Sequence, residues 1–463
     1  MVVHQDSDTI AAIATPPGVG GIGIIRISGP QALPILKTLF RPNLSHETFL
    51  SHRLYYGTVT AQDGTVLDEV LAAYMQAPNT YTREDVVELQ SHGSHLVLNS
   101  ILAETLRCGA RLARPGEFTK RAFLAGRIDL TRAEAVIDLL QARTDTGVRL
   151  AVGQVQGRLY QSIKEVRDAL VGILAVLEVA LDFPEDDVEL IDTKEILGQL
   201  EENVEIPLAR LVAMADQGKL IREGINIVIA GLPNVGKSSL LNALLQEDRA
   251  LVTSVPGTTR DTIEEMISIQ GIPARIVDTA GIRSDAGSVE ELGIERARRK
   301  MREADLVIFL VDASAPLTES DRELYNSIGH VSRIVALNKI DIAREDHAAS
   351  LKAAFPDVSL LEISAKEHRG LSALQETIYN KIMGDEPPLS ERDACAPNVR
   401  HLAALKETLA ACARLRNALS AGLTVDLIAV EVQFALDFLG DIVGLTTTED
   451  VLDKIFAEFC IGK

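Results

Sequence analysis

The chain has 463 residues and a net charge of −20, so it is too long for one ordinary hydrophobic core and too acidic to coat nucleic acid with its whole surface. The length favours about three domains, and because residues 1–121 are nearly neutral, a nucleic-acid partner would need local basic patches. No run of about eighteen uncharged apolar residues, no basic signal peptide and no paired cysteine spacing is present, which predicts a reducing cytoplasm and no membrane span.

The first 120 residues alternate short apolar runs with turn residues, a pattern typical of an α+β domain. We expect strands over Ile22–Ser28, Leu54–Val59 and Val66–Met75, and helices over Pro30–Phe40 and His95–Cys108. The glycines between Gly18 and Gly23 fit the dinucleotide spacing G-x-G-x-x-G, but they lead into a strand instead of following one and opening a helix. They therefore predict a tight turn that another backbone can approach closely.

A region of helical apolar spacing begins near residue 121 and contains few glycines. We expect helical segments over Thr131–Tyr160, Gln161–Leu181, Thr193–Arg222 and from Val425 onward. The stretch from Asp182 to Pro184 interrupts the pattern, as proline does in a helix. Thr446 and Glu449 stand three residues apart ahead of Val451–Phe459, which predicts a capping box.

Strands alternate with helices between about residues 221 and 383, the pattern of βαβ units and a mostly parallel sheet. The expected strands are Ile225–Ala230, Ala274–Val277, Leu306–Val311, Ile334–Leu337 and Leu360–Ile363. The predicted fold class is therefore multidomain α+β and α/β. An α+β domain (1–120) precedes a helical domain in two parts (121–220 and 384–463), and the α/β domain (221–383) is inserted between these parts.

The segment from Gly231 to Ser238, Gly-Leu-Pro-Asn-Val-Gly-Lys-Ser, fits the phosphate-loop motif G-x-x-x-x-G-K-[ST]. It lies between the expected strand Ile225–Ala230 and a helix over Ser239–Leu245, which is the context that the motif needs. Its glycines let backbone N–H groups and the helix N-terminus face a polyphosphate. Lys237 would add charge at the outer phosphates, and Ser238 would give an oxygen to Mg²⁺.

Three further motifs end the later strands, in the order found in GTPases. They are Asp278-Thr-Ala-Gly281, Asn338-Lys-Ile-Asp341 and Ser364-Ala-Lys366. Asp278 can hold Mg²⁺ through water, and the Gly281 N–H can meet the γ-phosphate. Asp341 can accept two N–H bonds from guanine, whereas the matching edge of adenine lacks that donor pair. The ordered set resembles the translation-factor class of P-loop GTPases, and the preference for GTP over ATP rests chiefly on Asp341.

Ile282 follows Gly281 at the position where Ras-like proteins carry the glutamine that positions water. Isoleucine cannot orient water, so hydrolysis needs another polar group, and Glu290 or Glu291 in the polar segment downstream could supply it. From residue type alone, the stronger interpretation is that both are solvated carboxylates that favour the N-terminus of a helix over Leu292–Met301.

A second switch segment is expected from Thr253 to Asp261, where a threonine hydroxyl would complete the coordination of Mg²⁺. Asn234 carries an amide oxygen inside the phosphate loop, near a place where a second cation could bind. K⁺ there could supply the charge that otherwise comes from an arginine finger. An asparagine that only braces the loop is an equally good interpretation of the bare motif.

The chain resembles, along its whole length, the MnmE (TrmE) family of tRNA-modifying GTPases. The resemblance rests on Asp8-Thr-Ile-Ala-Ala-Ile-Ala-Thr-Pro-Pro-Gly18, Arg114-Pro-Gly-Glu-Phe-Thr-Lys-Arg-Ala-Phe123, the single inserted GTPase domain and Phe459-Cys-Ile-Gly-Lys463. It implies that the wobble uridine of certain tRNAs receives a 5-carboxymethylaminomethyl or aminomethyl group, with the flavoprotein MnmG as the partner in a heterotetramer. It also implies a tetrahydrofolate derivative (5-formyl or methylene form) as the one-carbon donor, bound by an N-terminal domain that forms the homodimer. GTP hydrolysis would need K⁺ and proceed as two G domains meet.

The resemblance assigns roles to individual residues. GTP would contact Asn234, Val235, Gly236, Lys237, Ser238, Ser239, Thr253, Ser254, Val255, Pro256, Gly257, Thr258, Thr259, Asp278, Thr279, Ala280, Gly281, Asn338, Lys339, Asp341, Ser364, Ala365 and Lys366. K⁺ would be held by Asn234, Thr253, Val255 and Thr258, and Mg²⁺ by Ser238 and Thr259. Folate would meet Arg26, Glu88, Arg127 and Lys463, because a cationic side chain pairs with a glutamate tail and a carboxylate accepts pterin N–H groups. Family members often have lysine in place of Arg127, which keeps the charge but changes its geometry.

Three residues are implied in catalysis. Glu290 matches the family's water-orienting glutamate, which reverses the interpretation from residue type alone, and Lys237 would lie at the phosphates. Cys460 has two equally supported interpretations. It is either a nucleophile or folate-facing residue, or a small buried hydrophobe beside the last helix.

A ribosome-assembly GTPase of the Era or EngA kind is the alternative function, because those proteins share the GTPase motifs. EngA carries two phosphate loops, whereas this chain has one. Era carries a basic RNA-binding KH domain behind its G domain, whereas residues 384–463 are not basic. Both observations favour the tRNA-modifying function.

Overall fold

The structure is a computed structural model that describes residues 8–44, 48–182, 192–247, 264–278, 299–344, 351, 354–355, 358–384 and 395–463. Two compact units are present: the first comprises residues 1–137, 170–185 and 423–463, and the second residues 138–169 and 186–422. Within the described ranges, no helix combines the length and the apolar character needed to cross a membrane. The domain boundaries expected from the sequence remain predictions.

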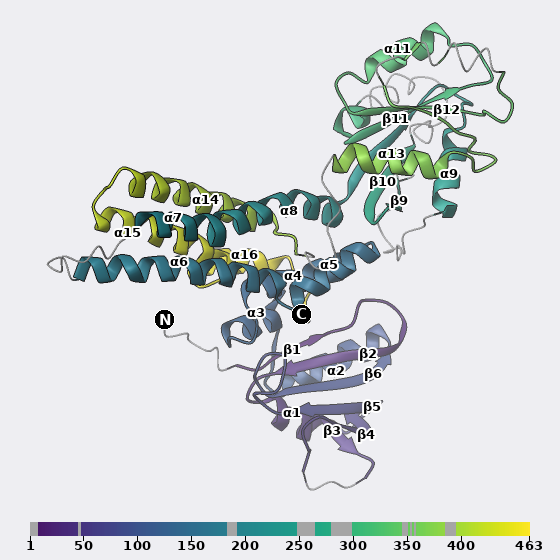
Figure 1. Cartoon of the computed structure of the whole chain (residues 1–463). Coiled ribbons are helices and arrows are strands. Elements are labelled where there is room, and N and C mark those ends of the chain that lie inside the picture. The colour runs from purple at the N-terminus through teal and green to yellow at the C-terminus, as the bar shows by residue number, and fades with distance from the viewer. Residues whose placement is uncertain are drawn as a thin grey trace. The chain divides into compact units, whose positions relative to one another are not determined.

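The first unit contains a sheet that is seven-stranded in its described part. Its strands, in spatial order, are β3 (Phe40–Pro42), β4 (Arg53–Thr60), β5 (Val66–Met75), β6 (Val86–Gly93), β2 (Gly20–Ser28), β1 (Ile10–Ile13) and β7 (Arg111–Leu112). Helices α1 (Ala32–Leu39) and α2 (His95–Arg107) lie along this sheet, and their apolar side chains form one core with it (Figure 1). The α+β architecture expected from the sequence is confirmed.

The close backbone approach expected at the glycine-rich segment is confirmed, but the expected turn is not, because Gly20, Gly21 and Gly23 lie within β2. Gly20 pairs with Gly93 of β6, and the register shifts between Gly20 and Gly23. A Cβ on Gly93 would lie 2.5 Å from the carbonyl oxygen of Gly20, so a side chain cannot fit there. Gly20 and Gly93 therefore allow β2 and β6 to pair closely at this end of the sheet.

The helical segments expected after residue 121 are present, with different divisions. The helices are α3 (Glu117–Leu124), α4 (Leu130–Gln141), α5 (Asp145–Val155), α6 (Arg158–Asp182), α7 (Thr193–Leu200), α8 (Ile206–Glu223), α14 (Val399–Ser420), α15 (Val425–Val443) and α16 (Glu449–Ala457), and a π-helical turn (Glu201–Glu205) joins α7 to α8. The run expected over Thr131–Tyr160 is interrupted because the Thr144 side chain caps α5 by accepting from the Gly147 N–H.

The predicted capping box at the last helix is wrong. The residue before α16 is Thr448, and its side chain makes no capping hydrogen bond. Thr446 instead donates to the Asp441 carboxylate over 2.5 Å, so its hydroxyl serves the turn after α15. Glu449 is the first residue of α16 and not its third.

The inserted domain is built on a sheet whose described strands number six. In spatial order they are β13 (Leu360–Glu362), β12 (Arg333–Asn338), β11 (Leu306–Asp312), β8 (Ile225–Ala230), β10 (Ile272–Asp278) and β9 (Glu264–Ile269). The pairs from β13 to β10 are parallel, and β9 is antiparallel to β10. The mostly parallel sheet is confirmed.

Helices cover both faces of this sheet. Helices α9 (Lys237–Glu247) and α13 (Leu371–Met383) share one core with it, whereas α11 (Glu319–Ser327) packs against the opposite face (Figure 1). The carboxyl ends of β8, β11 and β12 consequently open at one edge, where such sheets bind ligands.

Candidate functional site

The phosphate loop occupies the expected turn between β8 and α9. Gly236 and Asn234 have φ angles of 100° and 66°, in the left-handed region where glycine and asparagine are tolerated. A Cβ on Gly231 would lie 2.5 Å from the carbonyl oxygen of Leu310 in β11, and one on Gly236 would overlap the Asn338 side chain. Both glycines are therefore required by close packing.

Lys237 is buried and folds back over the loop. Its ammonium donates to the carbonyl oxygens of Gly231 at 3.0 Å and Leu232 at 2.9 Å. Ser238 and Ser239 are exposed in the first turn of α9. A cation and two hydroxyls thus surround backbone N–H groups at a helix N-terminus, an arrangement that suits a polyphosphate and Mg²⁺.

Asn338 joins the phosphate loop to the last strand of the site. Its Nδ2 donates to the Val235 carbonyl at 2.8 Å, and its Oδ1 accepts from the Ala365 N–H at 3.0 Å. The side chain is 2% exposed, so both bonds are shielded from water. The structure therefore brings together the predicted motifs at Gly231–Ser238, Asn338–Asp341 and Ser364–Lys366.

Lys339 makes a second connection to the loop. Its ammonium donates to the Asn234 carbonyl at 2.8 Å and to the Asp312 carboxylate at 2.6 Å. Burial would raise the pKa of Asp312, but the hydrogen bonds from Lys339 and Ser314 outweigh it and lower the pKa. Sequence reasoning missed Asp312. Its signal was a carboxylate that directly follows an apolar strand at the ligand-binding edge.

Asp341 is exposed and already oriented by a neighbour. Its carboxylate accepts from the Ser364 hydroxyl at 2.7 Å, and that hydroxyl accepts from the Glu367 N–H at 3.2 Å. The Ser364 hydrogen bond lowers the pKa of Asp341 below its ordinary value. A carboxylate that stays ionised and oriented is the group that guanine needs.

Several predicted residues lie outside the described ranges: Thr253, Ser254, Val255, Pro256, Gly257, Thr258, Thr259, Thr279, Ala280, Gly281, Ile282, Glu290 and Glu291. Of the two predicted metal sets, Asn234 and Ser238 are described. Asp278 is the last residue of β10, beside β8. No group of three or more His, Cys, Asp or Glu side chains suited to a metal occurs in the described part of the chain.

The predicted folate residues Arg26 and Glu88 face each other on β2 and β6. The Arg26 Nε donates to the Glu88 Oε1 at 2.9 Å, and its Nη1 donates to the Gly462 carbonyl at 3.3 Å. The guanidinium lies 5.8 Å from the centre of the Phe118 ring. A strand pair, α3 and the segment at Gly462 therefore meet around one arginine.

Backbone hydrogen bonds hold residues 460–463 against α3. The Phe118 N–H donates to the carbonyl oxygen of Lys463 at 3.2 Å, and the Gly116 N–H donates to that of Cys460 at 3.4 Å. The Cys460 side chain is exposed, so the interpretation as a buried hydrophobe is wrong. The Lys463 backbone is thus placed beside Arg26 and Glu88.

Arg127 lies on a neighbouring aromatic ring. Its guanidinium is 4.8 Å from the centre of the Tyr81 ring and donates to the Tyr81 carbonyl at 3.1 Å. Tyr81 packs against the small core that contains Phe118. Arg26 and Arg127 thus lie on two aromatic rings, Phe118 and Tyr81, that belong to one small core, and sequence reasoning missed both rings.

An ion network centred on Glu117 holds α3. Glu117 accepts from the Arg111 guanidinium at 2.6 and 3.0 Å, from Arg121 at 3.1 Å and from the Arg114 N–H at 2.8 Å. Arg121 also donates to the Asp8 carboxylate at 2.7 Å. Burial would raise the pKa of Glu117, but these donors outweigh it and lower the pKa.

Comparisons with known proteins match the whole chain. The family described as "GTP-binding protein TrmE N-terminus" matches residues 9–127, and "MnmE helical domain" matches residues 130–460. The tRNA modification GTPase MnmE of Desulfotalea psychrophila is 53% identical and covers 100% of both chains. That of Thermoanaerobacter sp. (strain X514) is 46% identical and covers 98% of this chain and 99% of its own.

Among solved structures, Aquifex aeolicus Era bound to a GDP complex is 30% identical and covers 40% of this chain and 66% of its own. Its TM-score is 0.29, too low to carry an argument. The end-to-end identity with the MnmE proteins carries the assignment. This chain belongs to the MnmE (TrmE) family of tRNA modification GTPases.

Proposed function

We propose that this GTPase modifies tRNA by installing the 5-carboxymethylaminomethyl or aminomethyl group on the wobble uridine, together with the flavoprotein MnmG. The observation that carries the proposal is the 53% identity to a tRNA modification GTPase MnmE over all of both chains. The phosphate-loop and guanine motifs, which Asn338 holds together, support GTP as the nucleotide. A homodimer, a heterotetramer with MnmG and a cytoplasmic location belong to the same proposal.

The surface around Arg26, Glu88, Arg127 and Lys463 is proposed to hold the tetrahydrofolate derivative, which supplies the one-carbon unit when bound. The donor set fits this group. Two arginines lie over the Phe118 and Tyr81 rings and can pair with the carboxylates of a glutamate tail. Glu88, oriented by Arg26, can accept N–H groups of the pterin. Cys460 is exposed beside this surface, where it could contact the ligand.

In the G domain, Lys237 and the loop N–H groups are proposed to bind the phosphates, with Ser238 and Thr259 as ligands of Mg²⁺. Asn234, Thr253, Val255 and Thr258 are proposed to hold K⁺ as two G domains meet. Glu290 would orient the attacking water, because Ile282 cannot. Asn234 on the loop and Ser238 in the first turn of α9 are both exposed, which supports these roles.

The test is nucleoside analysis of the wobble position in tRNA from a strain that lacks this protein. We expect the modified uridine to disappear and to return with the wild-type gene. Glu88→Gln should fail to restore it while purified variant protein still hydrolyses GTP, because Glu88 lies in the N-terminal domain. Glu407→Gln, an exposed carboxylate on α14, is the matched control and should restore it.

Unaltered wobble uridines in the deletion strain would refute the proposal. If such a strain instead accumulated immature ribosomal subunits, the protein would be a ribosome-assembly GTPase of the Era or EngA kind. Full restoration by Glu88→Gln would remove Glu88 from the folate site and leave the GTPase assignment standing.

A further inference from the structure

Helix α5 contacts the G domain through the turn of the β9–β10 hairpin. The hairpin turns at Gln270 and Gly271, whose φ angles are 48° and 91°. The Thr144 hydroxyl donates to the Gly271 carbonyl at 2.8 Å and accepts from the Gly147 N–H at 3.1 Å. A Cβ on Gly271 would overlap the Thr146 side chain. The group that caps α5 therefore also holds the hairpin.

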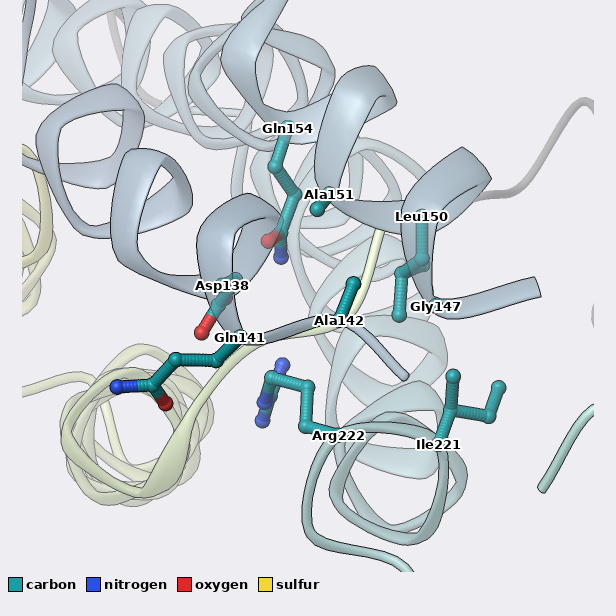
Figure 2. Close-up of a pocket in the computed structure, with 9 residues that line it drawn as sticks. All are labelled: Asp138, Gln141, Ala142, Gly147, Leu150, Ala151, Gln154, Ile221 and Arg222. Atoms are coloured by element: carbon teal, nitrogen blue, oxygen red, sulfur yellow. The ribbon is translucent and has the colours of Figure 1, made fainter. Parts of the chain in front are cut away.

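The other end of α5 holds the chain segment that follows the G domain. Gln154 of α5 and Arg222 of α8 both donate to the Ala396 carbonyl, and Arg222 also donates to that of Pro397 at 3.0 Å. Ala396 is fully buried and packs with Leu150. Figure 2 shows Gln154, Leu150 and Arg222 lining one small cavity. Helix α5 is thus fixed at one end to a G-domain hairpin and at the other to a linker.

Strand β10 connects the hairpin turn to the nucleotide edge of the sheet. It runs from Ile272, next to Gly271, to Asp278, a span of about 20 Å for a strand of this length. Asp278 pairs with Ile229 of β8, two residues before the phosphate loop begins at Gly231. The hydrogen bonds of β10 to β8 and β9 hold the strand together along its length. A displacement of β10 at the nucleotide edge would therefore also displace Gly271 relative to Thr144.

We propose that Thr144 is a positioning residue that couples the nucleotide site to α5 through the β9–β10 hairpin. The bound nucleotide changes the position of the hairpin, and the bond from Thr144 to Gly271 transmits this change to the first turn of α5. Because coupling between two sites is reciprocal, the state of α5 also changes the relative affinities for GDP and GTP. The inference goes beyond tRNA modification and holds for the GTPase alone.

Hydrogen exchange of the full-length protein tests the proposal, with GDP or a non-hydrolysable GTP analogue bound. In the wild type we expect the exchange of amides 145–150 to differ between the two nucleotides. Thr144→Val, which lacks the hydroxyl, should reduce this difference at least about fivefold, the lower end of allosteric coupling. The hairpin peptide 264–278 should keep its own response to the nucleotide. Thr144→Ser keeps the hydroxyl and should keep the difference.

Loss of the helix cap needs its own control, because Thr144 also caps α5. Thr318→Val removes the threonine cap of α11 and should leave the difference at residues 145–150 intact. Thr146→Ala removes a contact to the hairpin without touching the cap bond, and should reduce the difference even if Thr144→Val does not fold. The proposal would be overturned if the amides of α5 exchanged identically with both nucleotides. It would also be overturned if the exchange difference at residues 145–150 were undiminished in Thr144→Val.

Discussion

Asn338 joins the phosphate loop to the segment that is proposed to bind guanine. The Nδ2 of its amide donates to the Val235 carbonyl of the phosphate loop, and the Oδ1 accepts from the Ala365 N–H, next to Ser364, which donates to Asp341. Gly236 lies so close to this amide that a methyl group would displace it. Because Asn338 is buried, both hydrogen bonds are shielded from water, and a substitution there should disturb both segments.

Ser364 helps to keep Asp341, the carboxylate proposed to bind guanine, ionised. Its hydroxyl lowers the pKa of Asp341, so Ser364→Ala should let that pKa rise towards its ordinary value of 3.8. The carboxylate would then be neutralised at a higher pH as the solution is acidified, and GDP affinity would begin to fall earlier. We expect this in fluorescence titrations with labelled GDP between pH 7 and 4. Ser327→Ala on α11 is the control, and identical pH profiles for Ser364→Ala and the wild type would contradict the argument.

Glu290 is expected to carry the hydrolysis step. Glu290→Ala should bind GTP normally, but its turnover should fall by about a hundredfold or more. This is the usual loss when a side chain that accepts a proton from the attacking group is removed. Binding and single-turnover hydrolysis would be measured on the same preparation. Glu291→Ala is the matched neighbour and should retain turnover. The reverse result would move the role to Glu291.

At the scale of elements, α3 is held by the network around Glu117. The lowered pKa of Glu117 means that its contribution to stability is present above its unfolded pKa of about 4.5 and is lost as the pH falls through the lower folded pKa. Glu117→Gln should therefore destabilise the first unit by about 2–3 kcal/mol at pH 7, the cost of losing a buried charged hydrogen bond. This difference should shrink below pH 4.5. Urea unfolding followed by hydrogen exchange of residues 111–124 would measure it.

A control for this experiment is Glu69→Gln, which removes an exposed carboxylate from β5. It should change the stability little at any pH, because exposed charges contribute little. A destabilisation by Glu117→Gln that is the same at pH 7 and pH 4 would show that the network acts through shape and not through charge.

Elements whose apolar residues are continuous could be predicted from the sequence. Strand β8 was placed at Ile225–Ala230 because it is apolar except at Asn226, and β5 was placed at Val66–Met75, whose residues from Val70 to Met75 are all apolar. Strand β6 was missed because Glu88 and Gln90 interrupt its apolar residues, and the turn at Thr144 was missed because it is made by a cap bond. These depend on neighbours that only the folded chain supplies.

The candidate sites divide in the same way. The phosphate loop and Asp341 could be found because a short motif carries them, and the structure places both at the same sheet edge. Asp312 was missed although it directly follows the apolar residues of a strand, whereas Phe118 and Tyr81 could not be found because their arginine partners come from distant parts of the sequence. The roles proposed for Arg26 and Glu88 came from resemblance alone, and their ion pair became visible with the strand register.

At the scale of the whole molecule, K⁺ is expected to link hydrolysis to the meeting of two G domains. GTP turnover should be at least about tenfold faster in K⁺ than in Na⁺ at the same ionic strength. A tenfold rate difference corresponds to about 1.4 kcal/mol in the activation free energy of hydrolysis. Asn234→Gly tolerates the positive φ of this position and removes the amide oxygen, so it should abolish the difference. GDP affinity is the control and should change little. Equal wild-type rates in both salts would contradict the K⁺ assignment.

The backbone bonds from Gly116 and Phe118 to residues 460 and 463 set an order of events during synthesis. The N-terminal sheet leaves the ribosome early and can fold at once, since domains generally fold as they emerge. The surface beside Arg26 is incomplete until the segment around Gly462, which accepts a hydrogen bond from Arg26, has been synthesised. The entire G domain is translated before that segment. A nascent chain can therefore complete the phosphate loop before the surface that is proposed to bind folate is complete.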